Sequence, residues 1–188
     1  MHVLAISQGL GADWARWEAV ARSGIDSLMI REKQMGVRQL MALGQRLQEL
    51  DPGLQIWVNG RLDVALSLGA GFHGGEGYPT VPASLCRVSR PLHSPEQLCE
   101  RSVADQLLIS PVFAVPGKGK PLGIKGLHDI LDTLPPWGGR VLALGGINHE
   151  NAFSLKHSRL DGVALMRGLW EASSPRDTVA RLRRAWMR

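Results

Sequence analysis

The chain has 188 residues, 44% hydrophobic and 21% charged, which lies in the globular range and predicts a single domain over residues 1–188. No apolar run approaches the ~20 residues that cross a bilayer, and Met1 to Leu4 open a strand rather than a signal peptide, so we expect a cytoplasmic protein with no membrane partner. Cys86 and Cys99 lack paired metal spacing, which argues against a zinc site or a disulfide framework and predicts two small core residues. The net charge of +5 suits phosphorylated small molecules, and we expect no nucleic-acid partner.

Strands and helices are predicted to alternate along the whole chain. Strands are expected at 2–7, 25–30, 54–58, 71–73, 85–89, 104–110, 141–144 and 161–166. Helices are expected at 13–23, 37–50, 62–68, from 94 onward, at 124–134, at 148–157 and from 173 or 174 onward. The crossover 74–83 is too poor in helix formers to carry a helix. Alternation implies a parallel sheet, and eight units predict a compact (β/α)8 TIM barrel.

Barrel enzymes place their sites at the C-terminal ends of the strands, which predicts where the functional side chains of this chain gather. The residues at these ends are Ser7, Arg31, Glu32, Lys33, Asn59, Arg61, His73, Ser89, Ser110, Lys118, Gly145, Gly146, Arg167 and Gly168. Any one of them is as readily explained by pairing with a neighbouring loop. Together, the lysines and arginines beside glycine turns indicate an anionic substrate.

Two glycine turns follow successive strands, Gly145-Gly146 after strand 141–144 and Gly168 after strand 161–166. Glycine lets backbone N–H groups come close to a ligand oxygen, and a helix that follows adds the positive end of its dipole. One such turn would more simply connect a strand to a helix. Two on neighbouring strands predict a phosphate site, which such barrels frequently build after strands 7 and 8.

Seven short segments resemble the thiamine-phosphate synthase family, including its TenI-type thiazole tautomerase branch. They are Ile30-Arg31-Glu32-Lys33, Val58-Asn59-Gly60-Arg61-Leu62-Asp63-Val64-Ala65, His73 with its glycine, Ser89 with His93-Ser94, Ser110-Pro111-Val112-Phe113 with Lys118, Leu144-Gly145-Gly146-Ile147, and Asp161-Gly162-Val163-Ala164. The resemblance implies a homodimeric (β/α)8 barrel that holds a thiazole phosphate at the turns after strands 7 and 8. Together with the strand ends, it predicts substrate or phosphate contacts from Arg31, Lys33, Asn59, Ser89, Lys118, Gly145, Gly146, Arg167 and Gly168.

The departures from the family pattern concern the metal. In the synthases the Asn of the third strand is followed by an Asp that binds Mg²⁺, and this chain has Gly60 there. A second metal-binding Asp falls at Tyr78, and two Thr that hold pyrophosphate are replaced by Val115 and Gly117. Carboxylate-bound Mg²⁺ stabilises the leaving pyrophosphate in the synthases, so the departures predict no metal and no cofactor.

A Gly after the Asn also resembles the tautomerase branch, which aromatises a thiazole phosphate carboxylate by acid–base catalysis without a metal. We therefore expect a metal-independent thiazole tautomerase. A His that matters in some tautomerases falls at Pro111, so His73 is the first candidate base, because it ends a strand and has an unperturbed pKa near ~6.5. Glu32 and His93 follow, and a structural role is an equal alternative for each.

Two further alternatives stay open. The chain is a synthase with a degenerate Mg²⁺ and pyrophosphate site, or it is a non-catalytic regulator that binds thiazole phosphate. Arg167 also departs from the family, which places a small hydroxyl residue after strand 8. Its side chain either binds phosphate, points to the dimer surface or partly fills the pocket.

Overall fold

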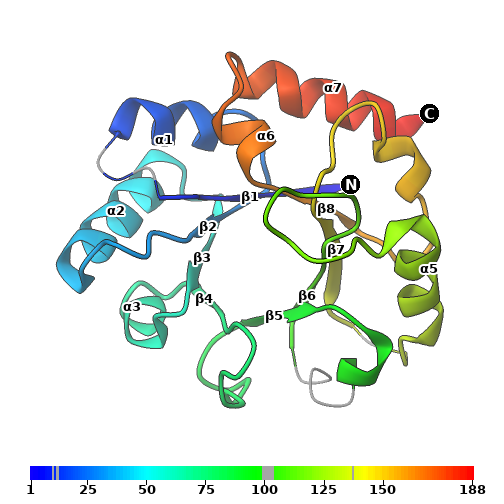
Figure 1. Ribbon diagram of the computed structural model, residues 1–188. Coiled ribbons are helices and arrows are strands. Elements are labelled where there is room, and N and C mark those ends of the chain that lie inside the picture. The colour runs from blue at the N-terminus through cyan, green and yellow to red at the C-terminus, as the bar shows by residue number, and fades with distance from the viewer. Residues whose placement is uncertain (10, 12, 99–103, 137) are drawn as a thin grey trace.

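The chain folds into a closed barrel of eight parallel strands in the order of the sequence (Figure 1). The computed structural model describes residues 1–9, 11, 13–98, 104–136 and 138–188. Each strand pairs with the next, and β8 closes the barrel on β1 with Val3 opposite Val163. The predicted (β/α)8 TIM barrel is therefore confirmed.

The strands of the barrel are β1 (His2–Ile6), β2 (Ser27–Ile30), β3 (Gln55–Asn59), β4 (Gly71–His73), β5 (Val88–Leu92), β6 (Gln106–Ile109), β7 (Arg140–Leu144) and β8 (Gly162–Leu165). The helices around it are α1 (Trp14–Ala21), α2 (Val37–Leu50), α3 (Leu62–Ser67), η1 (Pro95–Gln97), α5 (Gly123–Thr133), η2 (Ala152–Leu155), α6 (Arg167–Trp170) and α7 (Pro175–Met187). Residues 74–83 carry no helix, as expected from their composition. No helix of the described part is long and apolar enough to cross a membrane.

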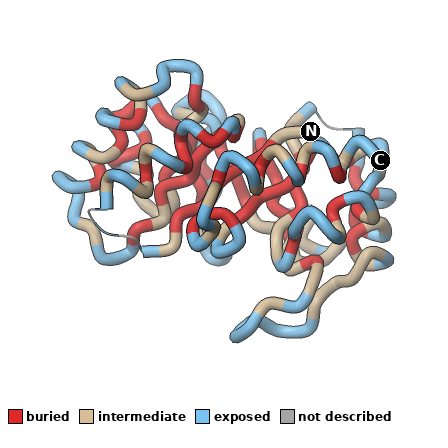
Figure 2. The backbone as a smooth tube through the Cα atoms, turned by 90° about the horizontal axis from the view of Figure 1, so that it is seen from above, coloured by how far each residue is buried: buried red, intermediate tan, exposed pale blue. Residues whose placement is uncertain are grey.

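Two separate groups of apolar side chains follow from the alternation of side chains along each strand. The smaller group fills the inside of the barrel and is made of Leu4, Ile6, Met29, Trp57, Leu108, Leu142 and Ala164. The larger group lies between the strands and the helices. The strands are buried along most of their length, and exposed residues lie on the surrounding helices and loops (Figure 2). A solid interior confines any ligand to one end of the barrel.

The fifth strand, predicted at 85–89, begins later in the structure. β5 spans Val88–Leu92 and includes a proline, Pro91. Proline disfavours the centre of a sheet because it lacks an N–H. The backbone of Pro91 faces β4, as that of Ser89 does, whose carbonyl accepts from Gly74 N. Because β4 ends at His73, the N–H that Pro91 lacks would have no strand partner there, and the proline is tolerated. The prediction was wrong by three residues, and Ser89 lies inside the strand rather than at its end.

The connections after β7 and β8 also differ from the predicted ones. Instead of a helix over 148–157 there is only the short 3-10 turn η2, so no long helix dipole points at the Gly145-Gly146 turn. Gly168 lies in a four-residue helix, α6, that the sequence pattern did not reveal. The last helix begins at Pro175, next to the predicted start at 173 or 174, and Ser174 is its N-cap. Cys86 is half-buried against the main core, and Cys99 lies outside the described residues.

Candidate functional site

A cavity of about 600 Å³ opens at the C-terminal ends of the strands, above the apolar interior of the barrel. It brings together most of the residues predicted to form the site: Arg31, Asn59, His73, His93, Lys118, Gly145, Gly146, Arg167 and Gly168. Its floor is made of apolar side chains that include Ile6, Met29 and Leu108. The cavity thus combines an apolar base with a polar rim, as small-molecule sites usually do.

Several residues expected at this end of the barrel do not line the cavity: Ser7, Glu32, Lys33, Arg61 and Ser89. Ser7 is buried and its Oγ accepts from Arg31 N at 2.8 Å. Arg61 pairs with Asp63 on the surface, and Lys33 is exposed. These residues belong to the same end of the barrel but lie outside the space open to a ligand.

The carboxylate of Glu32 is committed to the backbone of the loop after β1. Its two oxygens accept from Gly9 N at 3.0 Å and from Gly11 N at 3.1 Å, and the residue is 6% exposed. A carboxylate whose two oxygens each accept from a backbone N–H is held in one orientation, and Glu32 does not line the cavity. The geometry therefore indicates that Glu32 holds this loop, the structural alternative for that residue.

His73 lines the cavity but is not the near-neutral base that its residue type suggested. Burial, with the nearby charges of Arg90 and Arg31, lowers its pKa from 6.5 to about 4. Its Nδ1 lies 2.9 Å from Ser89 Oγ, which also accepts from Gln106 Nε2 at 3.2 Å. Because that hydroxyl still has a proton to donate, the arrangement favours a neutral imidazole with Nδ1 as acceptor and its proton on Nε2. At neutral pH His73 is thus suited to donating a hydrogen bond, because its pKa lies below the unperturbed value near ~6.5.

His93 lies at the rim and is half-buried. Its Nδ1 donates to the carbonyl of Ser110 at 2.5 Å, because a carbonyl oxygen can only accept. Its Nε2 lies 3.7 Å from a carboxylate oxygen of Glu76. One nitrogen is therefore fixed by the backbone, and the other faces an acidic side chain.

The Gly145-Gly146 turn packs closely against the loop that follows β6. Both glycines have positive φ, 109° and 64°. A Cβ on Gly145 would lie 2.9 Å from Pro111 Cα, and a Cβ on Gly146 would lie 2.8 Å from Phe113 Cβ. Phe113 N donates to Gly145 O at 3.0 Å and locks the two segments together. Glycine is required here because the backbone of the β6–α5 loop comes so close.

Three backbone donors at these turns are unpaired in the described part of the chain. Within the described residues, the N–H groups of Gly146, Arg167 and Gly168 have no protein acceptor. All three residues line the cavity. Unpaired N–H groups grouped around a concave surface are the features that bind phosphate oxygens in proteins.

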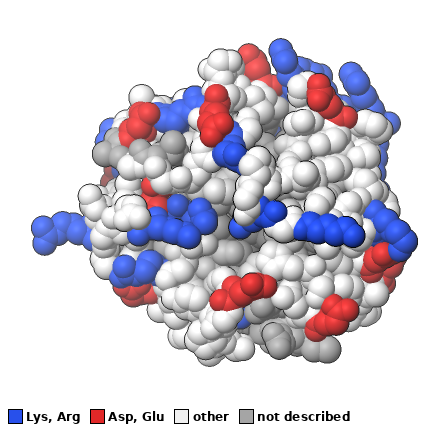
Figure 3. Space-filling model, viewed as in Figure 1, with Lys and Arg blue, Asp and Glu red and all other residues white. Residues whose placement is uncertain are grey.

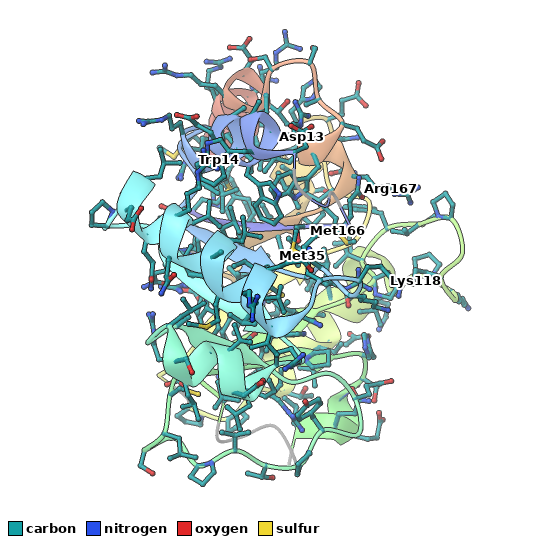
Figure 4. All side chains as sticks on the ribbon, turned by 90° about the vertical axis from the view of Figure 1, so that its left-hand side faces the viewer. Asp13, Trp14, Met35, Lys118, Met166 and Arg167 are labelled. Atoms are coloured by element: carbon teal, nitrogen blue, oxygen red, sulfur yellow. The ribbon has the colours of Figure 1, made fainter. Side chains whose placement is uncertain are left out.

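Cations outnumber acids around the cavity. Its lining includes Arg31, Lys118 and Arg167 but a single carboxylate, Glu171. Basic side chains cross the middle of the face seen in Figure 3. The loop that carries Lys118 projects beyond the barrel on the same side as Arg167 (Figure 4). The charge distribution suits a ligand with more than one negative charge.

Gly60 and Tyr78, where the resemblance would place metal-binding Asp, are joined by a hydrogen bond. Tyr78 Oη donates to Gly60 O at 2.8 Å, and the Tyr78 ring packs edge-on against Phe72. Tyr78 O in turn accepts from Arg90 Nη2 at 2.6 Å. The described residues contain no group of three His, Cys, Asp or Glu side chains that could hold a metal ion. The residues at this place do not fit a carboxylate-bound Mg²⁺.

Two contributors to the cavity were not predicted from the sequence, Glu171 and the apolar floor. Glu171 follows α6, and its carboxylate accepts from Gln8 Nε2 at 3.1 Å, which links the loops after β8 and β1. Met29 and Leu108 point inward by strand alternation, a signal that was available once the strands were placed. No sequence signal marked Glu171, because α6 itself was not predicted.

The fold agrees with what comparison with known proteins finds. The family model described as thiamine monophosphate synthase matches residues 10–169. The chain belongs to the thiamine monophosphate synthase family. A thiamine-phosphate synthase of Syntrophomonas wolfei is 32% identical over 183 residues, covering 89% of this chain and 85% of that protein. One from Archaeoglobus fulgidus is 30% identical over 171 residues, covering 84% and 79%.

Solved structures support the fold of this family member. Thiamine phosphate pyrophosphorylase from Pyrococcus furiosus superposes with a TM-score of 0.85 at 24% identity, covering 99% of this chain and 95% of that one. Orotidine 5'-phosphate decarboxylase from Pyrococcus horikoshii superposes with a TM-score of 0.74 at 13% identity, covering 98% of this chain and 99% of that one. The relatives are named synthases, so the family is one of thiamine biosynthesis. The comparisons favour the synthase alternative over the expected tautomerase.

Proposed function

We propose that this chain is a thiamine-biosynthetic transferase of the synthase type, which joins a thiazole phosphate to a pyrimidine pyrophosphate and releases pyrophosphate. The observation that carries the proposal is the single cavity that unites the glycine turns with Arg31, Lys118 and Arg167 above an apolar floor. Two phosphorylated heterocycles need such a combination of apolar surface and several cations. The membership of the synthase family supplies the reaction.

The thiazole phosphate belongs on the side of β7 and β8 in this proposal. The open N–H groups of Gly146 and Gly168 would donate to its phosphate oxygens. Arg167 lies beside them and is the natural counter-ion, so we prefer the phosphate-binding role among its three alternatives. The thiazole ring would rest on the apolar floor below.

The pyrophosphate of the second substrate belongs near Arg31 and Asn59, at the ends of β2 and β3, together with Lys118 on the loop after β6. When the bond to the pyrimidine breaks, negative charge develops on the leaving pyrophosphate. Protein cations already in place at the cavity would stabilise that charge. His73, neutral at pH 7, would donate a hydrogen bond from Nε2 rather than exchange a proton.

A second candidate function is the metal-independent tautomerase, and the bond between Tyr78 and Gly60 favours it. Without carboxylates at these positions, the usual electrostatic support of the synthase reaction is absent. A tautomerase needs no such support, but it needs an acid–base group. His93 is the better placed histidine for that role, because its Nε2 is at the rim beside Glu76.

Calorimetric titration tests the common part of both functions. Thiazole phosphate should bind at least ~10-fold more tightly than the corresponding thiazole alcohol, because charge-assisted hydrogen bonds to the phosphate are worth about 1.5–3 kcal/mol each. Equal affinities would overturn the assignment of the phosphate site. Turnover with each set of substrates then separates transferase from tautomerase, and binding without turnover of either would support the regulator.

A further inference from the structure

The short helix α6 is held in place by a side chain from the other end of the sequence. A four-residue helix cannot satisfy its own C-terminal carbonyl groups and has little stability by itself. Arg16 of α1 donates to three carbonyls at this end. Its Nε lies 2.5 Å from Trp170 O, and its Nη2 lies 3.2 Å from Leu169 O and 2.6 Å from Ala172 O.

The backbone of Arg16 and its neighbour Trp17 are each held by a further contact. Arg16 lies in the first turn of α1, where its own N–H donates to the N-cap carboxylate of Asp13 at 3.2 Å. Its neighbour Trp17 packs edge-on against Trp170 with ring centroids 4.9 Å apart. The α1 helix therefore contacts α6 through the Trp17–Trp170 ring pair and the Arg16 guanidinium. The Leu169 carbonyl also accepts from Ala172 N at 3.4 Å, whereas for the Trp170 carbonyl the guanidinium is the donor among the described residues.

We infer that Arg16 is a positioning residue for phosphate recognition. It touches no cavity surface, but it orients the turn whose residues Arg167 and Gly168 form the cavity wall. Inside α6, Leu169 N and Trp170 N both donate to Met166 O, whereas the N–H groups of Arg167 and Gly168, two residues that line the cavity, have no acceptor among the described residues. Because α6 is so short, loss of the bonds from Arg16 to its carbonyls would let the whole segment move, including the N–H groups of Arg167 and Gly168. This inference rests on the proposed function for the identity of the ligand, but its geometry does not.

The effect of losing Arg16 on ligand binding should be specific to phosphate groups. Displacing two donors by a fraction of an ångström weakens hydrogen bonds to a phosphate while leaving the apolar floor unchanged. Loss of Arg16 should thus cost affinity for phosphate groups and spare contacts with the ring.

Arg159 provides a matched control. It makes the same kind of contact at the end of α5, donating to the carbonyls of Leu131, Leu134 and Pro135, with 3.1 Å from Nη1 to Leu131 O. None of these residues lines the cavity. Arg159→Met should therefore reproduce the loss of stability of Arg16→Met without its effect on phosphate.

The test titrates ¹⁵N-labelled protein with inorganic phosphate and follows the amide signals of Gly146 and Gly168. In the parent protein both signals should shift. Arg16→Met should raise the dissociation constant about tenfold or more, Arg16→Lys should recover part of the affinity, and Arg159→Met should match the parent. Thermal unfolding of each variant measures the change in stability separately.

Two results would overturn the inference: equal phosphate affinity in Arg16→Met and Arg159→Met, or no response of the Gly168 amide in the parent protein. A different result would overturn only the proposed function. If inorganic phosphate shifts Gly168 in the predicted way but thiazole phosphate binds no better than inorganic phosphate, Arg16 retains its role and the ligand is another phosphorylated compound.

Discussion

Replacing His73 by Asn should flatten the dependence of stability on pH below neutrality. The imidazole is 7% exposed, and its pKa in the folded protein is lowered to about 4 by burial, by Arg90 and by Arg31. In the unfolded chain it should titrate near ~6.5. Between these values the unfolded state binds a proton that the folded state does not, so the free energy of unfolding falls as the pH falls.

The size of the effect follows from the two pKa values. A difference of about 2.5 pKa units at about 1.36 kcal/mol each lowers the free energy of unfolding by about 3 kcal/mol. This loss is absent well above pH ~6.5 and complete below pH ~4. The Asn variant keeps a polar group near Ser89 Oγ but cannot titrate. His2, whose pKa is also lowered to about 4, contributes equally to parent and variant and cancels in the comparison.

Denaturant unfolding at about pH 7 and about pH 4.5 measures the difference. The parent should lose about 2–3 kcal/mol more than His73→Asn between the two conditions. Identical losses would show that His73 titrates normally in the folded protein. That outcome would return it to the role of a proton-transferring base.

Four further predictions concern the cavity and the assembly. Lys118→Ala should weaken binding of inorganic pyrophosphate by about 10-fold or more in calorimetry, and unchanged affinity would remove Lys118 from the site. Gly146→Ala should lower the unfolding midpoint because of its φ of 64° and its contact with Phe113, whereas Gly168→Ala, with no atom within 4 Å of the new Cβ, should not; equal midpoints would refute this account of the turn. Tyr78→Phe should cost about 1 kcal/mol in denaturant unfolding by breaking the bond to Gly60, and no cost would deny that bond. Sedimentation should give a homodimer of the 20.5 kDa chain, and a monomer at all concentrations would contradict the resemblance-based expectation.

The barrel was predictable from the sequence because alternation of apolar strands and amphipathic helices is a local signal repeated eight times. Most of the cavity followed from one rule, since Asn59 and His73 end strands and Arg31 and the glycine turns follow strands. The inward or outward direction of a side chain at a strand end depends on register. A shift of one residue reverses it, which is why Glu32 was misplaced as a cavity residue while its neighbour Arg31 was not.

Features that depend on contacts between distant segments had no local signal. The short helix α6 is maintained by Arg16, about 150 residues earlier in the chain, so no window around it could reveal it. The lowered pKa of His73 likewise requires knowing that Arg90 and Arg31 lie nearby and that water is excluded. The pairing of Tyr78 with Gly60 depends on the conformation of the loop after β4.

The most direct test of the central claim is formation of thiamine phosphate from pyrimidine pyrophosphate and thiazole phosphate by the purified protein. The account predicts product and pyrophosphate in equal amounts, with the rate strongly reduced in Arg31→Ala and Lys118→Ala and little changed in Arg159→Met, which lies outside the cavity. Absence of thiamine phosphate, with aromatisation of a thiazole phosphate carboxylate by the same preparation, would contradict the transferase and establish the tautomerase instead.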